Sequence, residues 1–418
     1  MYPSLGIVAK VCEIPPGTDP FKPTLRKPSA ADQRVRLTTP LIRVDGELRP
    51  ASWNEALDTA AQKLQTAGAG TAALISPRLP IETLQAFKSL FRDGLRSQTA
   101  VSLGGEDAGA EFAASQSLPL EGRLELLSHA DCVLAVGTDL TNTHEVAGFM
   151  IKRNLQRGVK LIVIAPQESD FANLAHYTLR PGAGSVTDVV TALQAAILQA
   201  GMSHLPEDGA DAGETLAWAL SAAGLDASLV SEAAQTLAQA AAPVIIYEND
   251  LYASSDLAAS LLRLAQMAGA VDAERQGLIS LKGAANSLAA AQLYLDGSLA
   301  THGGPLVYLA LGDDQISDQL ARRLQSASGL VIQASYASVL TEMADVVLPA
   351  ATWAEQPGAY LNLEGRLQQA NPALPLPAGV CDNTAVLQAL AQRLQVSLSG
   401  DWRSTLSDRP SLVSLILN

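Results

Sequence analysis

The stretch ADCVLAVGTDLTNTHEVAGFMIKRNLQRGVKLIVIAP, residues 130–166, decides the fold. It opens with an apolar run that ends in a Gly-Thr-Asp turn, continues with a segment of helical character that ends at Gly158, and closes on a second apolar run. Two uniformly apolar strands joined by a crossover helix predict a parallel sheet covered by helices on both faces, because each strand is then buried on both sides. The expected fold class is therefore α/β.

The same strand-and-turn unit recurs along the chain. APVIIYEND (242–250) and PLVYLALGDD (305–314) are apolar runs that end in a polar turn, and three further short runs have the composition of strands, namely residues 71–76, 329–335 and 344–350. Ser52 precedes a helical pattern and has Glu55 three residues further on, which is the spacing of a capping box. With 418 residues the chain is too long for one ordinary core and should split into two or three lobes, and the recurring units favour two lobes with parallel sheets.

Composition excludes several functions. The net charge of −14 argues against a nucleic-acid binder, which needs a basic surface, and it predicts that any charged partner surface is basic. The three cysteines lie far apart and form no CxxC pair, which favours a cytoplasmic protein without a disulfide framework. No run of about 18 apolar residues is present, so we expect no direct membrane insertion and only indirect contact with a membrane.

A ligand, if one binds, is expected at the carboxyl ends of the strands. In open parallel sheets, ligands lie there, near the point where the strand order reverses. This places three turns on the candidate surface: Gly137-Thr138-Asp139, Asn249-Asp250 and Gly312-Asp313-Asp314. We expect the first and the last to face each other across the gap between the lobes. Their carboxylates have no basic neighbour in sequence, which disfavours a pyrophosphate but still allows hydrogen bonds from a guanine or a ribose.

Two long stretches carry a family resemblance. RLTTPLIRVDGELRPASWNEALDTAA (36–61) and ADVVLPAATWAEQPGAYLNLEGRLQ (344–368) resemble segments of the molybdopterin oxidoreductases. RPGAGS (180–185), SLVSEAAQTLA (228–238) and LKGAANSLAA (281–290) occur between them in the order of that family. The EGR spelling in the second stretch resembles the branch formed by the large iron–sulfur subunit, the G subunit, of bacterial NADH:quinone oxidoreductase, respiratory complex I. The resemblance covers roughly residues 34–370.

The resemblance implies a domain layout in which one lobe is inserted in the other. Residues 1–50 would be a strap left from an iron–sulfur cap, residues 51–110 and 241–375 the first lobe, and residues 111–240 the second. Residues 376–418 would be a helical tail. In this layout the strands at 71–76 and 242–248 share one sheet.

The same comparison indicates what the chain lacks. Catalytic relatives hold an iron–sulfur cluster with four cysteines, whereas this chain has only Cys12 in the corresponding region. The loop that would supply a metal ligand contains no Cys, and Asp107, Ser115 and Ser117 are only formal candidates. RPGAG and Ala359 also depart from the usual pattern. We therefore expect no catalytic residue, no metal and no cofactor in this chain. The candidates for a vestigial cofactor cleft are Gly137, Thr138, Asp139, Pro181, Gly182, Gly312 and Asp313.

Three functions remain open. The first is a structural or assembly role in the peripheral arm of complex I, beside a cluster-bearing ferredoxin-like module and at the inner face of the cell membrane through the complex. The chain would then begin after the electron-transfer part of that large subunit. The second is a subunit of a molybdenum or tungsten oxidoreductase that binds molybdopterin guanine dinucleotide. The third is a binding module that keeps a nucleotide cleft without redox work.

Overall fold

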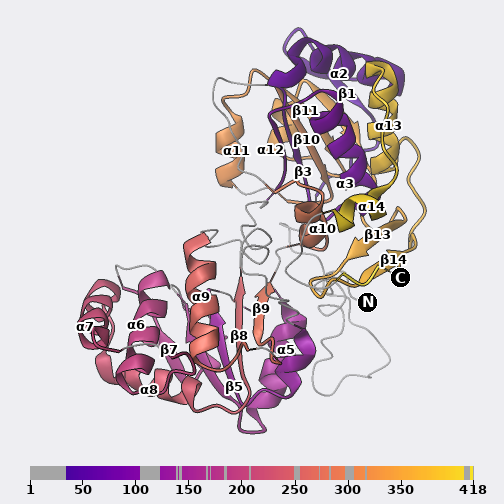
Figure 1. The fold of residues 1–418 in the computed structure, drawn as a ribbon. Coiled ribbons are helices and arrows are strands. Elements are labelled where there is room, and N and C mark those ends of the chain that lie inside the picture. Colours follow the sequence, from indigo (N-terminus) through magenta and orange to yellow (C-terminus); the bar gives the residue numbers. More distant parts are fainter. Residues whose placement is uncertain are drawn as a thin grey trace, which may run out of the picture.

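The computed structural model shows two lobes, each built on its own sheet (Figure 1). Residues 34–103 and 284–417, where described, form the first lobe, and residues between them form the second. The structure describes residues 34–103, 123–137, 140, 144–165, 168–169, 171–182, 186–206, 209–248, 255–272, 274–281, 284–296, 306–315, 318–408 and 415–417. In these ranges no helix is both long and apolar enough to cross a bilayer.

The first lobe has a seven-stranded sheet. In spatial order its strands are β2 (Glu47–Pro50), β1 (Leu41–Val44), β12 (Val346–Pro349), β11 (Gly329–Ala334), β10 (Leu306–Gly312), β3 (Ala72–Ile75) and β4 (Thr99–Ser102). The five strands from β12 to β4 are parallel, whereas β1 and β2 form an antiparallel hairpin at one edge. A separate hairpin consists of β13 (Gly358–Leu361) and β14 (Leu367–Ala370).

Helices cover both faces of this sheet. One face shares a core with α2 (Trp53–Ala67), α3 (Ile81–Phe87), α10 (Ser287–Gln292), α13 (Asn383–Leu394) and α14 (Trp402–Ser407). The other face packs against α11 (Asp318–Leu324) and α12 (Val339–Met343). Two further turns are η2 (Gly68–Gly70) and the π-helical η3 (Lys88–Gly94) that continues α3. The Ser52 hydroxyl accepts a hydrogen bond from the Glu55 amide at 3.2 Å, so the N-cap half of the predicted capping box of α2 is confirmed.

The second lobe has five strands, all parallel. Their order is β7 (Tyr177–Leu179), β6 (Lys160–Ile164), β5 (Cys132–Val136), β8 (Pro243–Glu248) and β9 (Leu278–Leu281). One face is covered by α6 (Val186–Gln199), α7 (Ala212–Ala223), α8 (Ala227–Ala238) and α9 (Ser255–Met267). The other is covered by η4 (Leu124–Ser128), α5 (Glu145–Leu155) and η5 (Ala172–Leu174). Every residue of β5 is buried, as expected for a strand covered on both sides.

The α/β class, the parallel sheets and the insertion of one lobe in the other are confirmed, but the predicted boundaries are wrong. Strand β8 pairs with β5 and not with β3, so residues 243–281 belong to the second lobe and not to the first. Strand pairing depends on long-range packing, which the sequence of β8 alone does not reveal.

The expected strap and tail at the two chain ends also need correction. The hairpin β1–β2 is part of the first sheet, so the described part of the strap belongs to this lobe. The helices of the tail, α13 and α14, bury apolar side chains in the core beneath α2 and α3. Two arginines in the segment expected to form a strap bind the rest of the lobe. Arg36 donates to Glu355, and Arg43 donates to the Ala344 carbonyl at 3.1 Å.

The two lobes are in contact through the tip of the β13–β14 hairpin. Asn362, Glu364 and Arg366 lie in the turn of this hairpin. The Glu364 carboxylate accepts a hydrogen bond from the Leu124 amide of the second lobe at 2.9 Å, and Leu363 packs against the apolar cluster there. The EGR segment therefore connects the two lobes.

Candidate functional site

Each sheet has a point where the strand order reverses, and these points locate the candidate site. In the first lobe it lies between β3 and β10, because β4 extends the sheet on one side while β11 and β12 extend it on the other. In the second lobe it lies between β5 and β8. The turns after these strands are where an α/β fold offers a crevice to a ligand.

Gly312 makes the sharp turn after β10. It has φ +57°, a backbone conformation that residues with a side chain rarely adopt, and its carbonyl accepts from the Ser335 amide at 2.7 Å. A Cβ at this position would lie 2.7 Å from Cδ2 of the buried Leu79. The glycine therefore allows β10 to end close to the loop after β3, and it directs Asp313 and Asp314 toward that loop.

Asp314 is fully engaged with the protein. The Ser76 hydroxyl, directly after β3, donates to Asp314 Oδ2 at 2.6 Å, and the Gln315 amide donates to Oδ1 at 2.8 Å. Ser76 Oγ also accepts from the Arg78 amide at 3.1 Å. These bonds tie together the two turns at the reversal point.

Asp313 is the more buried carboxylate, with a side chain only 9% exposed. The Arg78 guanidinium lies 3.9 Å from it, and Arg34 donates to its main-chain carbonyl at 2.8 Å. Burial raises the pKa of Asp313, although the charge of Arg78 opposes this shift. The fold thus supplies the basic neighbours that the local sequence lacks.

A second group of side chains lies at the carboxyl ends of the same sheet, beside β11 and β12. Arg36 forms an ion pair with Glu355 at 2.6 Å and donates to the Ser335 carbonyl at 2.6 Å. Glu355 also accepts from the Thr352 amide at 2.8 Å. The Arg34 guanidinium lies 4.2 Å from the ring centre of Tyr336, in a cation–π contact.

Sequence reasoning missed Arg78, Tyr336, Glu355 and Tyr360 as parts of this edge. Burial raises the pKa of Tyr360, and the negative charge of Asp313 adds to the shift. These residues come from separate turns, so their meeting depends on sheet order. The only available signal was their position just after a predicted strand, which Arg78 and Tyr336 both occupy.

In the second lobe, the described site residues have structural bonds. Gly137 ends β5 with φ +70°, and its amide donates to the Ile164 carbonyl at 2.8 Å. Pro181 is buried, and the Gly182 amide donates to the Ala223 carbonyl at the end of α7, also at 2.8 Å. Thr138, Asp139, Asn249 and Asp250 lie outside the described residues, as do Asp107, Ser115 and Ser117. Whether the two Asp-bearing turns face each other therefore stays a prediction.

The turn after β10 does not fit a pyrophosphate. Its two carboxylates would repel a phosphate, and the nearby Arg78 is already paired with one of them. In the second lobe, the Gly182 amide is used by the end of α7. The described residues also include no group of three or more His, Cys, Asp or Glu side chains that could hold a metal ion.

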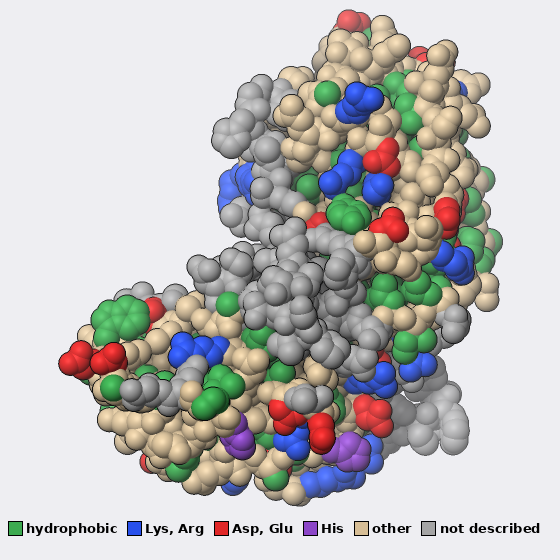
Figure 2. Space-filling model, viewed as in Figure 1, with side chains coloured by type: hydrophobic (Ala, Val, Ile, Leu, Met, Phe, Trp, Pro, Cys, Tyr) green, Lys and Arg blue, Asp and Glu red, His purple; other side chains and the backbone are tan. Residues whose placement is uncertain are grey.

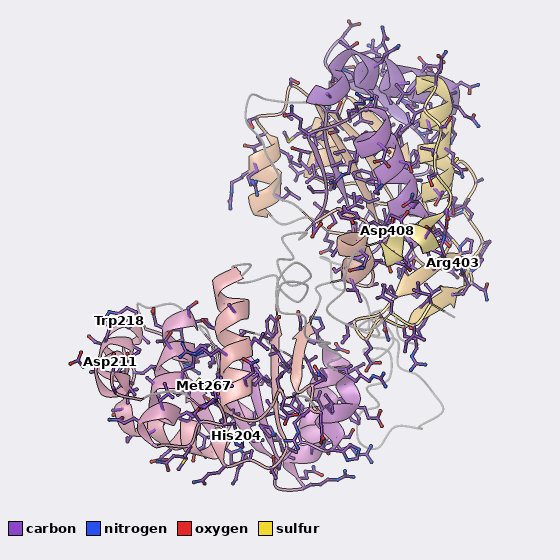
Figure 3. All side chains as sticks on the ribbon, in the orientation of Figure 1. His204, Asp211, Trp218, Met267, Arg403 and Asp408 are labelled. Atoms are coloured by element: carbon purple, nitrogen blue, oxygen red, sulfur yellow. The ribbon has the colours of Figure 1, made fainter. Side chains whose placement is uncertain are left out.

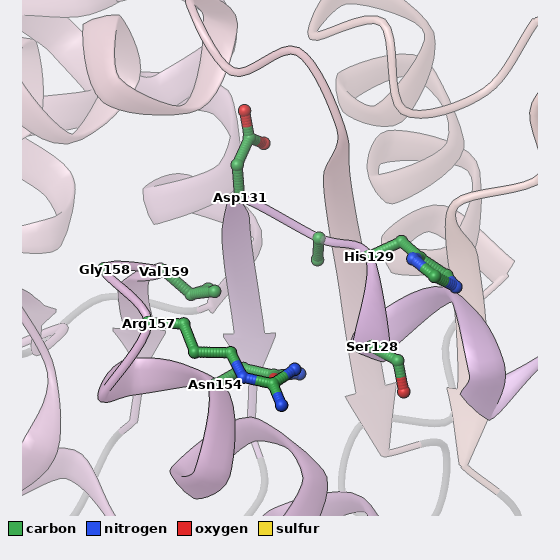
Figure 4. Close-up of a pocket in the computed structure, with 8 residues that line it drawn as sticks. Ser128, His129, Asp131, Asn154, Arg157, Gly158 and Val159 are labelled. Carbon is green, nitrogen blue, oxygen red and sulfur yellow. The ribbon is translucent and has the colours of Figure 1, made fainter.

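A separate hollow lies at the amino ends of the strands of the second sheet (Figure 4). It measures about 190 Å³ and lies before β5 and β6, at their amino ends. Asp131, on its rim, accepts from the Ala241 and Ala242 amides at 2.7 and 2.9 Å, and Asn154 donates to the Leu127 carbonyl at 2.7 Å. These bonds hold the start of β5, so the hollow is explained by local structure.

The fold and the reversal points define the class of protein. Residues 36–393 match the molybdopterin oxidoreductase family, and the chain belongs to it. The chain is 26% identical to the second NADH-quinone oxidoreductase G subunit of Rhizobium meliloti, over 81% of this chain and 45% of that protein. Against the NADH-quinone oxidoreductase G subunit of Streptomyces coelicolor the identity is 29%, over 90% of this chain and 49% of that one. The chain thus spans about half the length of these curated relatives.

The chain is also similar to a formate dehydrogenase subunit and, in fold, to two solved structures. The alpha subunit of F420-dependent formate dehydrogenase 1 of Methanococcus maripaludis is 24% identical, over 90% of this chain and 66% of that subunit. Among solved structures, acetylene hydratase from Pelobacter acetylenicus matches with a TM-score of 0.60 at 17% identity, covering 87% of this chain and 62% of that one. A chain of the formyltransferase/hydrolase complex from Methylorubrum extorquens matches with a TM-score of 0.57 at 16% identity, covering 85% of this chain and 98% of that one. These two likenesses confirm the fold.

Proposed function

We propose that this chain is a scaffold subunit of the peripheral arm of an NADH:quinone oxidoreductase, without a catalytic centre of its own. The observation that carries the proposal is the closed edge at the reversal point of the first lobe. There Asp314 and Asp313 are held by Ser76 and Arg78 through side-chain contacts within the chain. The similarity to the NADH-quinone oxidoreductase G subunits over more than four-fifths of the chain supports the choice of complex.

In this role the chain provides surfaces that bind other subunits, and it catalyses no step of the reaction. Its partners would be the other peripheral-arm subunits, including a cluster-bearing ferredoxin-like module, and it would reach the inner face of the cell membrane only through them. The Glu364–Leu124 contact supports such a role, since it links the two lobes at a point remote in sequence and so favours a fixed outer shape for partners.

The test is isolation of the complex from the native host by a tag on this chain, followed by native gel electrophoresis and elemental analysis. We expect comigration with the cluster-bearing subunits and with NADH:quinone oxidoreductase activity, and molybdenum and tungsten far below one atom per chain. A chain that migrates alone, or that carries either metal in stoichiometric amount, would refute the proposal.

The second candidate is a subunit of a molybdenum or tungsten oxidoreductase that binds molybdopterin guanine dinucleotide. The similarity to the formate dehydrogenase alpha subunits favours it, because it extends over 90% of this chain. The acceptor oxygens of Asp313 suit a guanine or a ribose better than a phosphate. Extraction of a pterin from the purified chain, identified by its fluorescence after oxidation, would support this candidate over the scaffold.

A further inference from the structure

Helix α7 presents a large aromatic side chain to solvent at the outer end of the second lobe. Trp218 is 60% exposed, although α7 buries Leu216, Ala219 and Ala223 on its inner face. Figure 3 labels Trp218 together with Asp211 on this outermost helix, and Figure 2 shows hydrophobic and acidic side chains adjoining in the same region. An exposed tryptophan is costly in water and is enriched at the centres of protein interfaces.

The stretch of sequence that contains α7 is acidic. Residues 181–262 contain ten Asp or Glu and no Lys or Arg. On α7 itself, Asp211 and Glu214 are exposed, and Glu214 precedes Trp218 by four residues, so both side chains lie on the same side of the helix. The exposed charged side chains of α7 and its N-cap, Asp211 and Glu214, are therefore negative, which selects a positively charged partner.

The shape of α7 adds a constraint on that partner. Gly213, Ala217 and Ser221 are exposed and follow one another at intervals of four, so they form a row of small residues beside Trp218. A row of this kind leaves a shallow groove along the helix, into which the side-chain ridge of another helix can pack. A second copy of this chain would bring the same negative face and would be repelled.

We propose that Asp211, Glu214 and Trp218, the α7 surface, dock a Lys/Arg-rich helix of another subunit of the complex. This inference rests on the proposed function and adds the chemistry of one partner. An arginine or lysine of that helix stacks on the Trp218 indole, and its neighbours pair with Asp211 and Glu214. The inner face of α7 stays packed on the second lobe, so docking requires no refolding.

The experiment uses the whole complex, isolated by a tag on this chain that carries the photoreactive substitution Trp218→p-benzoylphenylalanine. After illumination, mass spectrometry identifies the crosslinked peptide. The expected product joins the position of Trp218 to a Lys/Arg-rich helix of a subunit present in stoichiometric amount. In parallel, the double substitution Asp211→Lys with Glu214→Lys should lower the salt concentration at which that subunit dissociates, with a loss of about tenfold in affinity or more, as expected for charge reversal at an interface.

Asp408→Lys is the matched control, because Asp408 is an exposed acid that Figure 3 places on the other lobe. It should leave dissociation unchanged. A crosslink to a second copy of the chain, to a segment poor in Lys and Arg, or to nothing in an intact complex would overturn the docking proposal while the scaffold function stands. If the wild-type chain migrates alone, the function itself fails, and the docking proposal falls with it.

Discussion

The Glu364 carboxylate of the first lobe caps the Leu124 amide of the second, 240 residues away in sequence, with 2.9 Å between Oε1 and N. Its position is fixed by the hairpin turn, in which Asn362 Oδ1 accepts from the amides of Glu364 and Arg366 at 3.1 and 2.9 Å. The Gly365 carbonyl accepts from the Ile416 amide at 2.7 Å, so the segment around Ile416 stabilises the turn. The hairpin thus acts as a strut between the lobes.

Replacing Glu364 should loosen this strut. Glu364→Ala leaves the Leu124 amide without its protein acceptor, which costs about 0.5–1.5 kcal/mol when water can replace it. Hydrogen exchange followed by mass spectrometry should show faster exchange at residues 124–127, while peptides from β5 are unaffected. Glu342→Ala removes an exposed acid from α12 and serves as the control. Unchanged exchange in the Glu364 variant would show that the bond does not hold the lobes.

Asp313 should make stability depend on pH in a recognisable direction. Its pKa is raised in the folded protein, so its contribution is most favourable below the unfolded pKa and is lost as pH rises through the folded pKa. Asp313→Asn removes this titration. The stability of the variant relative to wild type should therefore increase between about pH 4, near the usual Asp pKa, and pH 7. Urea unfolding at both pH values measures the difference, and a pH-independent difference would contradict the assignment.

Tyr308 should be important for the core of the first lobe. Its hydroxyl donates to Gln333 Oε1 at 2.6 Å, and Gln333 in turn donates to Asn383 Oδ1 at 2.7 Å, at the start of α13. Tyr308→Phe leaves a buried acceptor unsatisfied, so unfolding should require about 1–3 kcal/mol less. Tyr336→Phe keeps the ring beside Arg34 and should change stability by less than about 0.5 kcal/mol. Denaturant titrations of the two variants decide the point, and equal effects would argue against the network.

Gly312→Ala should be destabilising at the reversal point. The positive φ alone costs about 1–2 kcal/mol for a residue with a Cβ, and the contact with Leu79 adds to it. Gly70→Ala is a fair comparison, because a Cβ there meets nothing within 4 Å and its φ is not positive. Thermal unfolding of both variants tests this, and a Gly312→Ala protein as stable as the Gly70→Ala protein would mean that the turn relaxes freely.

The strands are predictable because a strand buried on both faces is uniformly apolar in sequence. The apolar runs of β5, β6 and β10 indicate the parallel sheets from the sequence alone, and Ser52 marks the start of α2. The β1–β2 hairpin also has a local signal. Asp45-Gly46, both with positive φ, is the dipeptide typical of a two-residue hairpin turn.

The site is less predictable, since its members meet only after the sheets have formed. Arg78 and Asp313 are brought within 3.9 Å by the neighbouring positions of β3 and β10, which no local pattern encodes. The turn after β10 can be recognised as a polar surface from its sequence, but its ion-pair partner cannot. Likewise, β8 can be recognised as a strand but not assigned to the right sheet.

The division of the first lobe between the two ends of the chain has a consequence for biosynthesis. The second lobe is a continuous stretch from η4 to β9, so its sheet can form once residue 281 has left the ribosome. Strands β3 and β4, made earlier, must wait for β10, and their open edge is available meanwhile to other nascent chains. Of the described residues, the segment 415–417 that supports the hairpin is synthesised last. A message truncated just before it would yield a protein whose second lobe is complete, whose hairpin lacks its support, and whose first-lobe core lacks Leu415 and Leu417.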